Sequence, residues 1–106
     1  AYQPSELIDT MLSSPIEPCT DNTITDPDKM RLELSKIRKQ GYAMEDEEFQ
    51  KGLFCISAPI RGYKGRVIAA ISTTIPKYRL EPEKIPDIIK DIIETANKIS
   101  EELIKF

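Results

Sequence analysis

The chain has 106 residues, of which 40% are apolar and 31% charged, and its formal net charge is −3. This composition is typical of one small folded domain and excludes a disordered chain, because disordered chains combine low hydrophobicity with high net charge. The sequence has no apolar run long enough to cross a bilayer, and it lacks the basic stripe with which a protein binds duplex DNA.

The cysteine and histidine counts narrow the chemistry further. The chain has two cysteines, Cys19 and Cys55, and no histidine. Two cysteines without a secretory signal are typical of a reducing compartment, so we expect a cytoplasmic protein with free thiols. Without histidine there is no Ser-His, Cys-His or His-metal arrangement, and the commonest general base is missing. We therefore expect no metal, no cofactor and no catalytic residue.

The N-terminal part is predicted to contain two helices separated by a loop at residues 15–25. The first helix spans residues 4–13, and its apolar stripe is formed by Leu7, Ile8, Met11 and Leu12. The second begins after Asp26, a good N-cap followed by Pro27 in the first turn, and ends at Gly41. Its basic stretch, residues 36–39, is expected to face solvent.

The remaining elements are three strands and a long helix. A short strand is expected at residues 42–45, followed by an acidic turn. Two longer strands, 53–60 and 66–75, are rich in Ile, Val, Thr or Phe, and a turn at residues 62–65 joins them. From residue 85 onward, isoleucines recur at helical spacing. We expect an α/β domain of the α+β type, with an antiparallel sheet and a long C-terminal helix packed on it.

The hairpin geometry groups three side chains. With Tyr63 and Lys64 at the centre of the turn, opposed residues have numbers that add to 127. Cys55 then opposes Ser72, and Leu53 opposes Thr74. Opposed residues point to the same side of a sheet. Cys55, Ser72 and Thr74 therefore share one face, beside Leu53 and Ala70. The opposite face carries an apolar set: Ile56, Ile60, Val67 and Ile71.

The polar face has two interpretations. Small hydroxyls and a thiol beside apolar groups are typical of a small-ligand site, because hydroxyls both donate and accept hydrogen bonds. The alternative is a solvated strand face on which threonine is present only because it favours the β conformation. The assumed register decides the grouping, since a one-residue slip moves every side chain to the other face.

Residues 41–48 (GYAMEDEE) and 52–60 (GLFCISAPI) form two closely spaced motifs. They resemble the central signature of the effector domain of IclR-type transcription regulators. The resemblance covers nearly the whole chain, and the motifs keep their order and spacing. The other matching segments are Thr20 and residues 23–26 for the threonine-rich loop, residues 34–41 for the helix before the signature, residues 69–76 for the late strand and residues 96–100 for the last helix.

The resemblance implies a GAF-like domain that binds a small effector and shifts the DNA affinity of a separate winged helix. The family pocket positions fall at Glu45, Cys55, Ser72 and Thr74, with Asp46 as the alternative acidic residue. Glu45 stands where aspartate is usual and Thr74 where serine is usual, which implies a reshaped pocket. The implied partners are a small oxo-, hydroxy- or aromatic acid and further copies of the protein, as a homodimer or homotetramer.

The resemblance also implies that the domain is incomplete. The family domain is longer, and its first part, like the winged helix, lies upstream of Ala1. Residues 1–106 are thus expected to be the later portion of an effector-binding domain, cut or processed from a longer protein. This portion holds about half of the pocket, because the upstream part contributes backbone N–H groups to it.

Two other functions remain as alternatives. In the first, Cys55 is the nucleophile or redox centre of an enzyme. A reactive cysteine needs an activating cation, a helix N-terminus or a second cysteine. No basic partner is evident, and Cys19 lies in a distant loop. In the second alternative, the chain is an oligomerisation module whose ligand site has decayed.

Overall fold

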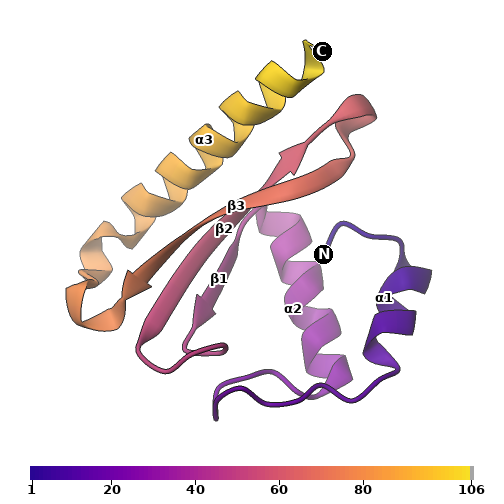
Figure 1. Ribbon diagram of the computed structural model, residues 1–106, viewed down its shortest axis with the longest axis vertical. Helices are drawn as coiled ribbons and strands as arrows, with labels where there is room; N and C mark the ends of the chain where they lie inside the picture. Colours follow the sequence, from indigo (N-terminus) through magenta and orange to yellow (C-terminus); the bar gives the residue numbers. More distant parts are fainter. Residues whose placement is uncertain (106) are drawn as a thin grey trace.

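The structure is a computed structural model that describes residues 1–105, so the last residue of the predicted 1–106 domain lies outside the described residues. Three strands form an antiparallel sheet in the order β1-β2-β3. In Figure 1, α3 runs along one face of this sheet, and α2 and α1 lie on the opposite side. The main elements are α1 (Ser5–Leu12), α2 (Pro27–Gln40), β1 (Ala43–Asp46), β2 (Leu53–Arg61), β3 (Val67–Pro76) and α3 (Ile85–Ile104). The predicted α+β class with a long C-terminal helix is confirmed.

Local sequence signals fix the ends of α2. The side chain of Asp26 accepts a hydrogen bond from the Asp28 N–H, 3.0 Å away, and Pro27 occupies the first turn. Gly41 follows the helix in the left-handed region at φ 86°, which glycine adopts without a steric penalty. The stretch from Lys36 to Lys39 keeps its three basic side chains exposed. These predictions are confirmed.

The α3 face of the sheet is the hydrophobic core. In β2 every second side chain is buried, and α3 packs against this row. The buried apolar residues are Phe54, Ile56, Ala58, Ile60, Ile92 and Ala96. Ser100 is buried with them: its hydroxyl donates to the Ala96 carbonyl at 2.8 Å and accepts from the Arg61 N–H at 2.9 Å. These two hydrogen bonds connect the last turns of α3 to the end of β2.

The hairpin register differs from the prediction by two residues. Cys55 pairs with Thr74, and Ser57 pairs with Ser72, so the numbers of opposed residues add to 129. The turn contains three residues, Tyr63–Gly65, closed by the Gly62 N–H donating to the Arg66 carbonyl at 2.8 Å. A bulge beside Ile60 and Arg61 adds one more residue to β3.

A shift of two residues preserves the faces of a strand, but the bulge changes one assignment. Val67 precedes the bulge and pairs with Arg61, so the alternation reverses there. Val67 therefore lies on the face of Cys55, and its predicted place in the apolar set with Ile71 is wrong. Beyond the bulge, Ile71 packs against the core as predicted.

The predicted stripe of α1 is only half buried. Ile8 and Leu12 are partly covered, whereas Leu7 and Met11 remain 44% and 65% exposed. The helix is short and packs beside α2 rather than on the sheet, so it has one narrow contact face (Figure 1). In residues 1–105 no helix combines the length and the apolar character that crossing a bilayer requires.

Candidate functional site

The sheet brings three of the predicted site residues into one row. Glu45 of β1 pairs with Cys55 of β2, and Cys55 pairs with Thr74 of β3. Directly opposed residues share a face and have Cβ atoms about 4.5–5.5 Å apart. The Cys55 Sγ and the Thr74 Oγ1 lie 3.3 Å apart, within hydrogen-bonding distance. The three side chains therefore present a carboxylate, a thiol and a hydroxyl side by side.

The fourth predicted residue lies in the adjacent row of the same face. Ser72 pairs with Ser57, and Ser57 pairs with Ala43. Ser57 was not among the site residues predicted from the sequence. The signal was nevertheless present, since Ser57 lies two residues from Cys55 and successive side chains alternate.

The predicted lining residues divide between the two faces. Leu53 and Ala70 lie on the face of Cys55, as the pairing of the strands requires. Asp46 pairs with Phe54, so it lies on the opposite face of the sheet from Glu45. Its carboxylate forms an ion pair with the Lys77 Nζ at 2.9 Å. The structure thus groups Glu45, and not Asp46, with the cysteine and the hydroxyls.

The Glu45 carboxylate is oriented by backbone groups of the loop after β1. Its Oε1 accepts hydrogen bonds from the N–H of Glu48 at 3.1 Å and the N–H of Phe49 at 2.9 Å. These bonds leave the Oε2 atom as an acceptor for a further donor. No motif or spacing in the sequence predicts these two hydrogen bonds, because they depend on the path of the loop.

The charge around this end of the sheet is negative. Burial raises the pKa of the Glu48 carboxyl, and the neighbouring carboxylates of Glu45 and Glu33 raise it further. On the far side of the same loop, the hydrogen bond to Asp46 raises the pKa of Lys77. A group with hydrogen-bond donors suits the Glu45 end of the face better than an anion does.

A hollow of about 230 Å³ adjoins the second row. Its lining includes Ala43, Ser57 and Ala70 of the sheet, together with Ile37 of α2 and Tyr2. The volume is slightly below the roughly 300–1,000 Å³ of typical small-molecule pockets. The Glu45–Cys55–Thr74 row is not part of its lining and continues the same face beyond it. The hollow and the two rows together form one surface, bounded on one side by α2.

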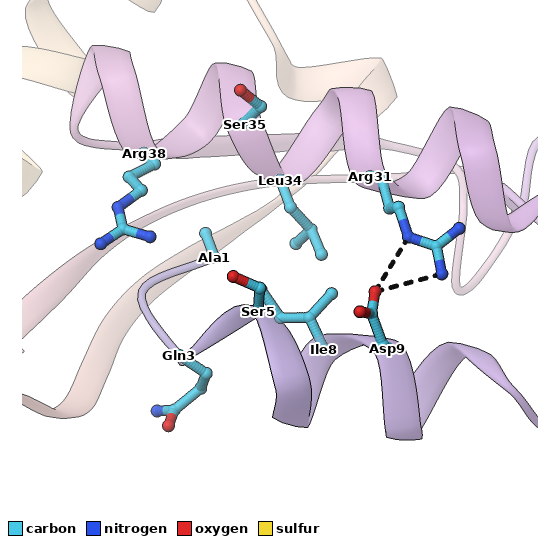
Figure 2. Close-up of a pocket in the computed structure, with 9 residues that line it drawn as sticks. All are labelled: Ala1, Gln3, Ser5, Ile8, Asp9, Arg31, Leu34, Ser35 and Arg38. Carbon is cyan, nitrogen blue, oxygen red and sulfur yellow. Dashed lines mark hydrogen bonds and ion pairs between the residues drawn. The ribbon is translucent and has the colours of Figure 1, made fainter.

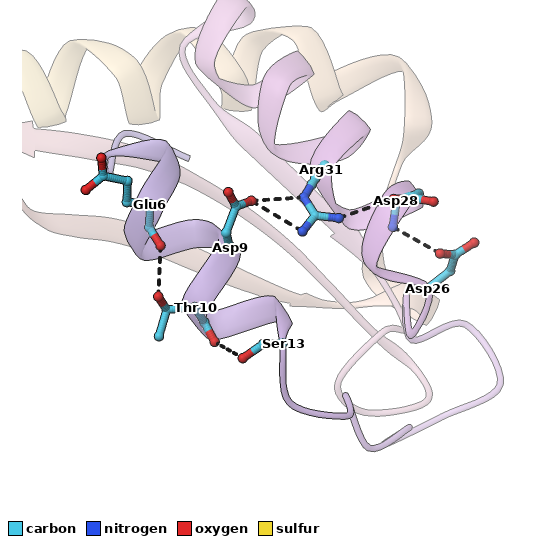
Figure 3. Close-up of polar contacts among 7 residues, drawn as sticks. All are labelled: Glu6, Asp9, Thr10, Ser13, Asp26, Asp28 and Arg31. Carbon is cyan, nitrogen blue, oxygen red and sulfur yellow. Dashed lines mark hydrogen bonds and ion pairs between the residues drawn. The ribbon is translucent and has the colours of Figure 1, made fainter.

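A second hollow, of about 210 Å³, lies between α1 and α2 (Figure 2). At one end Arg31 is paired with Asp9 at 3.3 Å, and at the other end lies Arg38. Arg31 also pairs with Asp28 at 3.2 Å, as Figure 3 shows. Because two carboxylates neutralise the Arg31 cation, we interpret this hollow as a gap in helix packing.

Cys55 lacks the surroundings of a catalytic thiol. Its cross-strand neighbours are the Glu45 carboxylate and the Thr74 hydroxyl, and neither supplies the positive charge that stabilises a thiolate. Cys19 is exposed in the loop before α2, and both cysteines are free. The arrangement is suited to binding rather than to nucleophilic chemistry.

Comparison with known proteins identifies the family. The profile described as bacterial transcriptional regulator IclR C-terminal matches residues 1–101. The DNA-binding transcriptional repressor YiaJ of Escherichia coli is 41% identical over 88 residues, which are 83% of this chain and 31% of YiaJ. The crystal structure of Thermotoga maritima IclR superimposes with a TM-score of 0.86 at 35% identity, covering 96% of this chain and 42% of that one.

The C-terminal domain of the E. coli regulator KdgR is also similar. Its crystal structure gives a TM-score of 0.86 at 28% identity and covers 96% of this chain and 63% of that one. The chain belongs to the IclR C-terminal family. These relatives are named as transcription regulators or repressors, which confirms the prediction of a regulatory rather than an enzymatic protein. The chain spans about a third of the length of the curated relatives it matches.

Proposed function

We propose that this chain is the later portion of an effector-binding domain and that its effector lies on the sheet face that carries Glu45, Cys55, Ser72 and Thr74. The observation that carries this proposal is the placing of these four side chains in two adjacent rows of one face. The opposite face packs against α3, and Ser57, in the row of Ser72, lines the hollow of about 230 Å³. A few polar groups that converge beside apolar side chains are typical of ligand sites.

Each side chain has a defined part in the proposed site. The free oxygen of Glu45 accepts from a hydroxyl or an amine of the effector. Ser72 and Thr74 donate to or accept from its oxygen atoms, and Ser57 extends this set toward the hollow. Cys55 contributes a small wall and a weak donor. Asp46 is no longer proposed for the acidic role, because Lys77 pairs with it on the other side of the strand.

In this proposal, other parts of the whole protein complete the effector site and bind DNA. A remaining part of the domain closes the site and supplies donors for the carboxylate of a small oxo-, hydroxy- or aromatic acid. A separate winged helix binds DNA in the cytoplasm, and effector binding shifts its affinity. The domains associate as a homodimer or homotetramer. The fraction of the relatives that this chain covers supports such a division.

The test uses the full-length protein. A thermal-shift screen of small organic acids identifies a ligand, and calorimetric titration then compares Thr74→Val with Thr73→Val. Valine keeps the branched shape of threonine and removes only the hydroxyl group. Thr74 is in the Cys55 row, whereas the adjacent Thr73 pairs with Ile56 on the core side, so Thr73→Val is a matched control.

Thr74→Val is expected to weaken binding by roughly fivefold to a hundredfold, because a lost hydrogen bond costs about 1 kcal/mol, and more when a buried ligand group is left unpaired. Ser72→Ala is expected to fall in the same range. Thr73→Val should bind like the parent protein. Parent-like binding by both Thr74→Val and Ser72→Ala would show that the effector lies elsewhere.

A further inference from the structure

Two threonines of the loop before α2 hold the acidic loop after β1. The hydroxyl of Thr20 donates to the carbonyl of Glu47, and the hydroxyl of Thr23 donates to the carbonyl of Glu48. The side-chain amide of Asn22 adds a third bond, to the carbonyl of Asp46 at 3.2 Å. Three consecutive carbonyls are therefore bound by side chains more than twenty positions earlier in the chain.

The threonine hydroxyls are themselves oriented by their own loop. The Oγ1 of Thr23 accepts from the N–H groups of Cys19 and Thr20, each at 3.0 Å. The Oγ1 of Thr20 accepts from the Asn22 N–H at 3.1 Å. With the acceptor side occupied by backbone N–H groups, each hydroxyl hydrogen is directed at the acidic loop. Valine has the shape of threonine but makes none of these bonds.

The same acidic loop orients Glu45. The residue whose carbonyl Thr23 binds, Glu48, uses its N–H to bind the Glu45 Oε1, and the Phe49 N–H binds the same atom. The peptide groups between the two sets of bonds are rigid. Displacing the carbonyls of Glu47 and Glu48 must therefore move the two N–H groups that hold the carboxylate.

We propose that Thr20 and Thr23 are positioning residues for the effector site, acting through the acidic loop to fix the Glu45 carboxylate. This inference rests on the proposed function only in assigning Glu45 to the effector. The two hydroxyls set the direction of the free Glu45 oxygen. A site whose acceptor is fixed in this way selects effectors that offer a hydroxyl or an amine at one position.

The acidic loop needs these hydrogen bonds, because charge repulsion and an unfavourable backbone conformation destabilise it. The carboxylates of Glu45 and Glu33 repel that of Glu48, and this repulsion adds to the effect of burial in raising the pKa of Glu48. Glu47 adopts a φ of 58°, in the left-handed region. This conformation is energetically unfavourable for any residue other than glycine. On the opposite side, Glu47 accepts from the Gly52 N–H at 2.8 Å. The threonine bonds complete this support.

The experiment compares the unliganded parent chain with the double variant Thr20→Val/Thr23→Val. Hydrogen exchange is measured at the amides of Glu48, Phe49 and Ile56, the last of which lies in the core strand β2. The carboxyl carbon of Glu45 is followed by NMR. Thr25→Val is the matched control, because Thr25 is exposed in the same loop region. Thr23→Ser restores the hydroxyl and is the rescue variant.

The double variant is expected to lower protection at Glu48 and Phe49 by about fivefold to thirtyfold, from one to two lost hydrogen bonds of about 1 kcal/mol each. Protection at Ile56 should be unchanged, and the Glu45 carboxyl signal should shift. Thr25→Val and Thr23→Ser should resemble the parent. If the double variant does not fold, Thr23→Val alone gives the same comparison at about fivefold.

Two results would overturn the positioning role. In one, Glu48 and Phe49 keep their protection in the variant. In the other, protection falls by the same factor at Ile56, which means that the threonines only stabilise the fold. No ligand is used, so either result is separate from the titrations that test where the effector binds.

Discussion

The two faces of one three-stranded sheet have opposite physical characters. Against α3, β2 presents Phe54, Ile56, Ala58 and Ile60, all buried. On the other face the same strand presents Leu53, Cys55, Ser57 and Pro59, which are only partly covered. Because side chains alternate along a strand, nine residues are enough to build a core and a polar surface back to back.

This difference separates stability from binding. The apolar side chains of the α3 face lose contact with water, and their burial stabilises the fold. The hydroxyls, thiol and carboxylate of the open face have little packing to lose. Substitutions on the α3 face should therefore change the free energy of unfolding, and substitutions on the open face should change binding.

The largest expected effect is at Ile56, which is 0% exposed. Ile56→Ala should lower the free energy of unfolding by about 2–5 kcal/mol, because the removed methylene groups leave a cavity in the core. Cys55→Ala, one residue away on the open face, should cost much less. Urea denaturation of the two variants measures the contrast, and equal losses would contradict the division between the faces.

A smaller loss is expected at Ser100, the buried polar group of the α3 face. Ser100→Ala removes the acceptor of the Arg61 N–H and leaves that donor without the bond, at a cost of about 1–3 kcal/mol. Thr95→Ala is the control, because the Thr95 hydroxyl also bonds a carbonyl of α3 but is exposed. If the two variants have the same denaturation midpoint, the hydrogen bond between Ser100 and Arg61 contributes little to stability.

The faces were predictable from the sequence because they depend only on alternation. A register error of two residues leaves Cys55, Ser72 and Thr74 together, so the site face was found in spite of it. Val67 was misplaced because a bulge between its position and Ala69 reverses the alternation. The helix limits at Asp26 and Gly41 were predictable because capping is local.

The support of Glu45 was not predictable, for a different physical reason. It requires the loop of Thr20 and Thr23 to approach Glu47 and Glu48, which are more than twenty residues away along the chain. No periodicity or capping rule encodes such a contact. The sequence marked both segments as resembling family motifs, but only the structure shows that they bind each other.

The smallest expected effect concerns the charge of Glu48 at the edge of the open face. Burial, and then repulsion by Glu45 and Glu33, raise its pKa above the ordinary value of 4.5. The folded protein therefore binds this proton more tightly than the unfolded chain does. Between 4.5 and the raised pKa the folded state holds more protons, so the free energy of unfolding falls as the pH rises through this window.

Glu48→Gln removes this titration and should be slightly more stable than the parent at pH 7. The advantage should disappear below about pH 4.5, where the Glu48 carboxyl of the parent becomes protonated in both the folded and the unfolded state. Glu83→Gln replaces an exposed carboxylate before α3 and is the control for the loss of one negative charge. Thermal melts of the three proteins from pH 3.5 to 8 measure the difference. A Glu48→Gln variant that loses stability at pH 7 would mean that the carboxylate forms a bond the fold requires, and the open face would then contribute to stability as well as to binding.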